Sequence, residues 1–282
     1  MKITHRQLRQ IIREELIHES RYFGMSVDQL LSYLEGFGDN TWIFFDTETT
    51  GLTPHGRQLT EIAAVAVSAN NWSDREAEPL GTFNEKIKLT DDTLEQMEDE
   101  ARNPPGGRKK SIADLLQMTS YEESGRTYLE EQEAITRFLK FVESFPAPVL
   151  VAQNAAFDME FVSVRSGGRM KTSYPVIDTM RVMQLFLIPL LRTLRGPPHN
   201  DAEAADLLSR LKKGRRYSTS MGVVSPAYGI SIEGWHRALD DVKMMMKMFR
   251  HVVETLRSGI DVDISAEHGR EAAYQRRRKK RR

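Results

Sequence analysis

The stretch that decides the fold is Trp42-Ile43-Phe44-Phe45-Asp46-Thr47-Glu48-Thr49-Thr50-Gly51-Leu52. It is a hydrophobic, β-forming run that leads into two carboxylates and a turn at Gly51. Residues i and i+2 of a strand project from the same face, so we expect Asp46 and Glu48 to point the same way. Two carboxylates that close together repel each other unless a cation lies between them. A hard divalent cation fits this pair; the alternative is an edge strand whose acidic side chains face water.

The composition is that of a globular protein, with 282 residues, 40% hydrophobic and 28% charged. This length holds one large domain or two smaller ones. No apolar run approaches the roughly 20 residues that span a bilayer, and the N-terminus lacks the apolar core of a secretory signal. Cysteine is absent, so disulfides and thiolate metal sites are excluded. We therefore expect a cytoplasmic protein without membrane contact, in which carboxylate, carbonyl or imidazole groups hold any metal.

The net charge of zero hides an asymmetry. Residues 276–282 are all basic, so the remaining positions hold 33 Lys and Arg against 40 Asp and Glu. We predict a basic, flexible C-terminal tail at residues 259–282 and a basic loop at 212–216. Both can neutralise nucleic-acid phosphates, and the alternative reading is that they are simply solvated.

Residues 1–38 are predicted to form a helical N-terminal extension. A helical stripe lies within residues 3–19, and a second short helix begins with a capping box formed by Ser26 and Gln29. The stripe either packs on the main domain or docks on a protein partner. Its apolar members are Leu8, Ile11, Ile12 and Leu16.

The main domain is predicted at residues 40–258. Its first three strands follow one another with short links, which indicates an antiparallel meander. From Glu130 onward helices and strands alternate, which favours parallel strands joined through helices. The predicted fold class is therefore α/β, with a mixed β-sheet flanked by helices. The expected strands are 42–50, 61–67, 80–87, 149–152 and 176–177, and the expected helices include one from Glu130, one through Val164, one ending near Pro189 and a last one from His236 to about Leu256.

Two further segments carry acidic residues after the first stretch. Asp158 follows a strand within Asn154-Ala155-Ala156-Phe157-Asp158, and Asp241 lies on the last helix, five residues after His236. Positions i and i+5 lie about 140° apart on a regular helix. His236 and Asp241 can therefore serve one site only if His236 precedes the helix or lies in its first turn.

These three segments resemble the signatures of the DEDD superfamily of 3′–5′ exonucleases, within its DEDDh (DnaQ-like) branch. Asp46-Thr47-Glu48-Thr49-Thr50-Gly51-Leu52 is close to the first family motif, and Asn154–Asp158 matches the second, although Gln153 stands where many relatives have His. The third motif has the five-residue His-to-Asp spacing of the His branch. The Tyr branch would need Tyr at the position of Arg237. The resemblance covers residues 41–256.

The resemblance implies an RNase H-like fold and a metal-dependent 3′–5′ exonuclease that releases nucleoside monophosphates from single-stranded DNA or RNA. Asp46, Glu48, Asp158 and Asp241 would hold two Mg²⁺ ions roughly 4 Å apart, with Mn²⁺ able to substitute. His236 would take the proton of the attacking water.

The resemblance also implies residues that contact the substrate. The Thr47 backbone would face the terminal 3′ hydroxyl, and Leu52 would wedge against the terminal base. Asn154 and Phe157 would shape the same pocket. Asp178, at the end of a strand, is expected to cap a helix or support the site rather than to bind metal. These assignments leave the choice between DNA and RNA open.

A different class of function stays open beside the enzyme. The chain can be a proofreading or processing subunit that acts mainly as a tethered partner of a polymerase or another nucleic-acid machine. Its predicted N-terminal helix would supply the tether. The complete set of four carboxylates and one histidine argues against a purely structural subunit.

Overall fold

The structure is a computed structural model that describes residues 24–74, 77–102, 128–170, 174–233 and 236–259. The chain divides into two compact units. The first, called the sheet unit, comprises the described residues of 35–180 and 230–247, and the second unit comprises those of 1–34, 181–229 and 248–282. The predicted helix at 3–19 and the basic tail at 260–282 lie outside the described residues. The domain limits near residues 38, 40 and 258 stay predictions.

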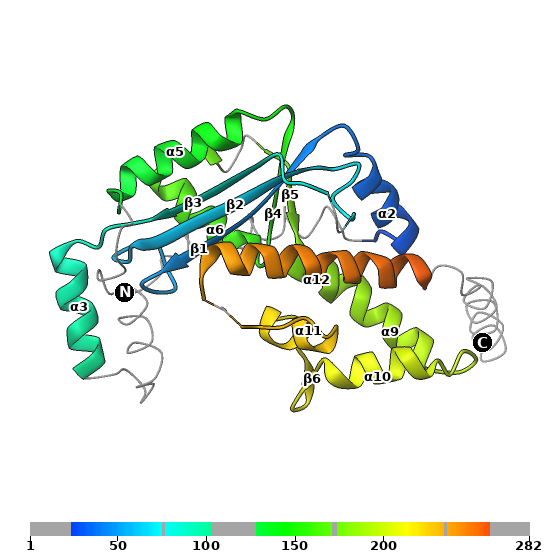
Figure 1. The fold of residues 1–282 in the computed structure, drawn as a ribbon. Helices are drawn as coiled ribbons and strands as arrows, with labels where there is room; N and C mark the ends of the chain where they lie inside the picture. Colours follow the sequence, from blue (N-terminus) through cyan, green and yellow to red (C-terminus); the bar gives the residue numbers. More distant parts are fainter. Residues whose placement is uncertain (1–23, 75–76, 103–127, 171–173, 234–235, 260–282) are drawn as a thin grey trace, which may run out of the picture. The chain divides into compact units, whose positions relative to one another are not determined.

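The sheet unit is built on a five-stranded sheet in the order β3-β2-β1-β4-β5 (Figure 1). β1 is antiparallel to β2, β2 is antiparallel to β3, and β1 and β5 are each parallel to β4. The predicted mixed sheet, with an antiparallel meander followed by parallel strands, is therefore confirmed. The strands are β1 Thr41–Thr49, β2 Leu59–Ser68, β3 Gly81–Lys86, β4 Pro148–Ala152 and β5 Val176–Asp178.

β1 is central because it is apolar on both faces. Ile43 and Phe45 belong to the core cluster beneath helices α5 and α6, and alternation turns Trp42 and Phe44 to the opposite face. There the ring of Trp72 lies 4.8 Å from that of Trp42, between centroids. With both faces covered, a strand this hydrophobic belongs in the middle of a sheet.

Helices α5 Glu131–Glu143 and α6 Ala155–Arg165 pack on the sheet. The buried residues of α5 recur at helical spacing, and its Phe138 ring lies 5.6 Å from those of both Phe45 and Phe83. α6 connects β4 to β5 and contacts both strands. A further helix, α3 Asp91–Arg102, follows β3. The first motif therefore lies on β1, and the second lies at the start of α6.

The second unit contains a helix that continues past Pro189, where the sequence predicted an end. The chain runs through α8 Thr179–Val182, the π-helical turn η2 Met183–Leu187 and α9 Ile188–Arg195. Pro189 lies in the first turn of α9, where a proline is tolerated. The predicted helix end near Pro189 is therefore wrong.

The basic stretch at 212–216 is a hairpin instead of a plain loop. β6 Lys212–Lys213 pairs with β7 Arg216–Tyr217, and Gly214 turns the chain with a φ of 63°. Glycine adopts this conformation without the steric cost that other residues bear. The remaining helices of this unit are α10 Ala202–Arg210 and α11 Met221–Ala227.

Two helices each include residues that are assigned to both units. α12 Ala238–Ser258 is one continuous helix whose first half belongs to the sheet unit. α2 Val27–Glu35 begins with the predicted capping box: the Ser26 N–H donates to Gln29 Oε1 over 2.8 Å, and the Gln29 N–H donates to Ser26 Oγ over 3.2 Å. In the part of the chain that the structure describes, no helix is long and apolar enough to cross a membrane. The cytoplasmic location stays a prediction.

Candidate active site

Asp46 and Glu48 lie in the last half of β1, two residues apart, and project from one face of the strand. Their ladder partners on β2 are Ala63 and Glu61. A register shift between Glu48 and Thr49 then ends the regular pairing. The strand thus presents both carboxylates immediately before the chain turns away from the sheet.

Asp158 lies in the first turn of α6 and is buried, with 2% of its surface exposed. One of its oxygens, Oδ1, accepts two hydrogen bonds from Thr47, from the backbone N–H over 3.0 Å and from Oγ1 over 2.7 Å. Thr47 sits between Asp46 and Glu48 in the sequence. The two bonds therefore attach the helix of the second motif directly to the strand of the first.

The turn that precedes α6 is held by Asp178 at the end of β5. The carboxylate of Asp178 accepts the N–H of Asn154 over 3.2 Å and the N–H of Ala155 over 3.1 Å. Asn154 has a φ of 60°, the left-handed conformation that asparagine tolerates. Asp178 thus satisfies free N–H groups at the start of α6, which confirms its predicted helix-capping role. Gln153, at the position where the family motif often has His, accepts a hydrogen bond from the hydroxyl of Thr179.

His236 and Asp241 meet because His236 lies outside α12. His236 has a φ of 74° and precedes the helix, whereas Asp241 lies in its first turn with 3% of its surface exposed. The backbone N–H of His236 donates to Asp241 Oδ2 over 3.2 Å. His236 therefore precedes the helix, as the five-residue spacing requires if both residues are to serve one site.

The first and third motifs meet in one group of potential ligands, which does not include Asp158 of the second motif. One ring nitrogen of His236 and one carboxylate oxygen each of Glu48 and Asp241 all lie within 4.8 Å of one another. Asp46 adjoins this group, since the charges of Asp158, Glu48 and Asp241 all raise its pKa.

The carboxylates of the site resist ionisation. Burial, followed by the charges of Asp241, Glu61 and Asp158, raises the pKa of Glu48 to about 8. Burial also raises the pKa of Asp241 to about 7 and that of Asp158 to about 7, although Thr47 opposes the rise at Asp158 through both of its hydrogen bonds. Burial, followed by the charge of Asp158, raises the pKa of Asp46 well above its ordinary value. A bound cation would stabilise the ionised form of these carboxylates.

A divalent cation fits the donor set. Oxygen donors with an imidazole nearby suit Mg²⁺ and Mn²⁺. Among the described residues, Oδ1 of Asp241 is buried without a hydrogen-bond partner. A buried carboxylate oxygen in this state is costly, and coordination to a metal would satisfy it.

Glu61 was not among the site residues expected from the sequence. This residue lies opposite Glu48 in the β1–β2 ladder, is only 7% exposed, and its charge raises the pKa of Asp46, Glu48 and Asp241. The signal was present in the sequence, because a lone acidic residue stands in the otherwise apolar run of β2. Buried carboxylates rarely occur without a charged partner or a function.

The predicted substrate residues differ in accessibility. Leu52 is 83% exposed, whereas Thr47 is buried and its N–H is engaged by Asp158. Asn154 is exposed, and the half-buried ring of Phe157 packs 5.0 Å from that of Phe161, between centroids. Their roles toward substrate stay predictions.

Comparisons with known proteins agree with the motifs. No family model matches the chain. It is 26% identical over 225 residues to the PolC-type DNA polymerase III of Clostridium perfringens, covering 79% of this chain and 12% of that protein. It is 29% identical over 159 residues to the PolC-type DNA polymerase III of Bacillus cereus, covering 56% of this chain and 9% of that protein. The chain thus spans a small fraction of these curated relatives.

The fold is also that of a solved exonuclease. The crystal structure of Escherichia coli exonuclease I with single-stranded DNA and a bound zinc ion aligns with a TM-score of 0.55 at 18% identity, covering 79% of this chain and 42% of that one. The chain is thus similar in sequence to PolC-type DNA polymerase III proteins and in fold to exonuclease I, and its acidic motifs resemble those of the DEDD-type 3′–5′ exonucleases.

Proposed function

We propose that this chain is a metal-dependent 3′–5′ exonuclease of the His branch, which releases nucleoside monophosphates from the 3′ end of a single-stranded nucleic acid. The observation that carries the proposal is the meeting of Glu48, His236 and Asp241 within 4.8 Å at the end of β1. Two segments far apart in the sequence, the end of β1 and the start of α12, meet there. A two-metal phosphodiesterase needs this combination of clustered carboxylates and a neighbouring base.

The four carboxylates of Asp46, Glu48, Asp158 and Asp241 would hold two Mg²⁺ ions, and Mn²⁺ would substitute. When bound, such ions lower the pKa of a water molecule and stabilise the charge that develops on the leaving 3′ oxygen. The raised pKa values of the carboxylates support this assignment, because they show that the protein alone does not compensate the negative charge. Thr47 and Asp178 contribute indirectly, by fixing Asp158 and the turn before it.

His236 would accept the proton of the attacking water at an imidazole nitrogen. Its backbone is anchored to Asp241, while its side chain is exposed and reachable from solvent. Imidazole has an ordinary pKa near neutrality, which suits a general base. Leu52, Asn154, Phe157 and the backbone of Thr47 would contact the terminal nucleotide.

Digestion of matched single-stranded DNA and RNA, each labelled at its 5′ end, tests the proposal. With Mg²⁺ or Mn²⁺ we expect a ladder that shortens from the 3′ end, and EDTA or Asp241→Ala should abolish it. Asp240→Ala is the matched control, because it removes the adjacent carboxylate, which is not among the clustered ligands. The preferred strand also resolves the choice between DNA and RNA. Absence of cleavage with either metal contradicts the proposal.

A second candidate is a subunit that works tethered to a larger machine. The specific support is that similarity to the PolC-type polymerases covers most of this chain but only 12% of the C. perfringens protein. In such an assembly the exonuclease acts on the 3′ end that its partner holds. Co-purification of a large partner that disappears when residues 1–38 are removed would favour this candidate. Full activity of the isolated chain, with no partner recovered, would count against it.

A further inference from the structure

The loop that follows the first motif is closed at its base. Residues 51–57, called the Leu52 loop, connect β1 to β2. The Thr50 N–H donates to the carbonyl of Gln58 over 2.9 Å, and the Gln58 N–H donates to Thr50 Oγ1, also over 2.9 Å. These two bonds hold Thr50 and Gln58, the residues that flank the loop, against each other.

The tip of the Leu52 loop presents a hydrophobic side chain to solvent. Leu52 is 83% exposed, and Thr53, His55 and Gly56 are exposed as well, whereas Pro54 is buried. A single exposed leucine is ordinary by itself. What distinguishes Leu52 is that the backbone around it is held from outside the loop.

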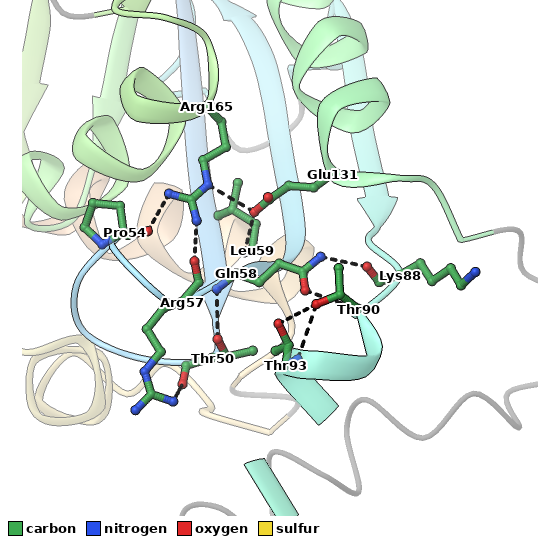
Figure 2. A network of polar contacts seen from close by, with 10 residues as sticks. All are labelled: Thr50, Pro54, Arg57, Gln58, Leu59, Lys88, Thr90, Thr93, Glu131 and Arg165. Atoms are coloured by element: carbon green, nitrogen blue, oxygen red, sulfur yellow. Dashed lines mark hydrogen bonds and ion pairs between the residues drawn. The ribbon is translucent and has the colours of Figure 1, made fainter. Parts of the chain in front are cut away.

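Arg165 supplies that hold from the C-terminal end of α6. Its guanidinium donates to the carbonyl of Pro54 over 2.7 Å and to the carbonyl of Arg57 (Figure 2). Its Nε donates to Glu131 Oε1 over 3.3 Å, and the same oxygen accepts the N–H of Leu59 over 2.8 Å. Three donors in a rigid plane reach three acceptors, an arrangement that arginine can make and lysine cannot. The Arg165 side chain is only 14% exposed, so water competes little for these bonds.

A second arginine, Arg57, belongs to the loop itself and binds residues outside it. Arg57 forms a two-pronged ion pair with Glu100 of α3 and donates to the carbonyl of Thr50 over 3.3 Å. Gln58 continues the network, because its side chain donates to the carbonyl of Lys88 and accepts the N–H of Thr90 (Figure 2). The loop is therefore braced from both sides.

The helix that carries Arg165 also carries Asp158. The two residues are seven positions apart, which is about two turns, so they lie on nearly the same face of α6 and about 10 Å apart along its axis. Asp158 in turn is bonded to Thr47 of β1. One rigid helix thus connects the carboxylate cluster at one end with the Leu52 loop at the other.

We propose that Arg165 is a positioning residue that sets the distance between Leu52 and the metal-binding carboxylates, and so places the 3′-terminal nucleotide. The inference rests on the proposed exonuclease function and adds a residue that no motif contains. A wedge against the terminal base is useful only if it stands at a constant distance from the bond to be cleaved. A displacement of about 1 Å in a reacting group can cost about 10²-fold in rate.

The test compares a substrate that has a terminal base with one that has none. Arg165→Ala and Arg165→Lys should lower kcat/KM for a single-stranded oligonucleotide by about tenfold or more. Hydrolysis of bis(p-nitrophenyl) phosphate, a diester without a base, should stay within about twofold of wild type. Arg137→Ala is the matched control, because Arg137 makes exposed ion pairs with Glu85 and Glu133 away from the loop. It should change neither rate.

A double-mutant cycle links the two residues. If Arg165 acts through Leu52, the effects of Arg165→Ala and Leu52→Ala on the oligonucleotide are not additive. Additive effects, or an equal loss on both substrates, would mean that Arg165 only stabilises the fold, and would overturn the proposal.

A binding measurement keeps the proposal testable if the chain hydrolyses neither substrate. An oligonucleotide with 2-aminopurine at its 3′ end reports contact with its terminal base by fluorescence, and Ca²⁺ can replace Mg²⁺ to separate binding from cleavage. We expect a fluorescence change with wild type that is absent in Leu52→Ala and Arg165→Ala but kept in Arg137→Ala. No change with wild type, or an equal change in all variants, overturns the inference irrespective of catalysis.

Discussion

The backbone N–H of His236 donates a hydrogen bond to Oδ2 of Asp241 over 3.2 Å, joining the last residues before α12 to its first turn. The bond uses the main chain of His236 and not its imidazole. It also consumes only one oxygen of Asp241, and the other is buried without a hydrogen-bond partner among the described residues. The pair thus brings an imidazole and a carboxylate to the same site.

Replacement of the imidazole should therefore remove catalysis without removing metal. His236→Ala keeps the backbone bond to Asp241, and we expect kcat to fall by about 10²–10⁴-fold, the usual contribution of a general base. Mn²⁺ affinity, measured by calorimetric titration, should change little. A variant that retains more than a tenth of the activity would show that another group takes the proton.

The hydroxyl of Thr47 should support metal binding through Asp158. Thr47→Val removes the 2.7 Å bond from Oγ1 to Asp158. This bond lowers the pKa of Asp158, which is about 7, so its loss should raise that pKa. A higher pKa means that a proton competes with the metal more strongly, so Mn²⁺ affinity at pH 7 should fall by about threefold to tenfold. The loss should shrink at pH 9, where Asp158 ionises in both proteins. Thr47→Ser keeps the hydroxyl and serves as the control; equal losses in both variants would contradict this account.

Without metal, the stability of the protein should fall as the pH rises. Glu48 has a pKa of about 8 in the folded state and an ordinary value of 4.5, so between these values the folded state holds a proton that the unfolded state has released. The free energy of unfolding therefore decreases with pH across this window. In EDTA we expect the melting temperature to drop by on the order of 5 °C between pH 5 and pH 8.

Two comparisons check the origin of that drop. Glu48→Gln should reduce the drop without abolishing it, because the neutral amide carries no charge to bury while the carboxyl groups of Asp46, Asp158 and Asp241 still titrate. Saturating Mg²⁺ or Mn²⁺ should restore stability most at pH 8, where the carboxylates are ionised and bind metal best. A melting temperature that rises from pH 5 to pH 8 in EDTA would refute the assignment.

The basic hairpin should contribute to substrate affinity. Lys212, Lys213, Arg215 and Arg216 are all exposed, and the structure shows no ion pair for them within the described residues. Arg215→Gln together with Arg216→Gln should weaken binding of single-stranded DNA and reduce the slope of log K against log salt by about 0.7 for each phosphate that the protein no longer neutralises. Arg137→Gln with Lys140→Gln on α5 removes the same charge elsewhere. An identical salt dependence in the two double variants would show that the hairpin is merely solvated.

Local patterns explain the parts of the fold that were predicted correctly. The hydrophobic run of β1, the short links to β2 and β3 and the capping box of Ser26 and Gln29 each act within a few residues. The spacing of Asp46 and Glu48 on a strand likewise sets their common face. Pro189 misled the prediction because a proline marks a helix end in isolation but is accepted in a first turn after a π-helical segment.

The strands, the mixed sheet and the three acidic segments with their family resemblance were therefore predictable from the order of the amino acids. Three relationships became visible in the folded chain: Glu61 pairs opposite Glu48, Asp178 caps the helix of Asp158, and Arg165 binds the Leu52 loop. The physical reason is distance along the chain. Arg165 and Pro54 are 111 positions apart, and such contacts arise only when the packing of the sheet and its helices brings their backbones together, which local propensity and spacing do not encode.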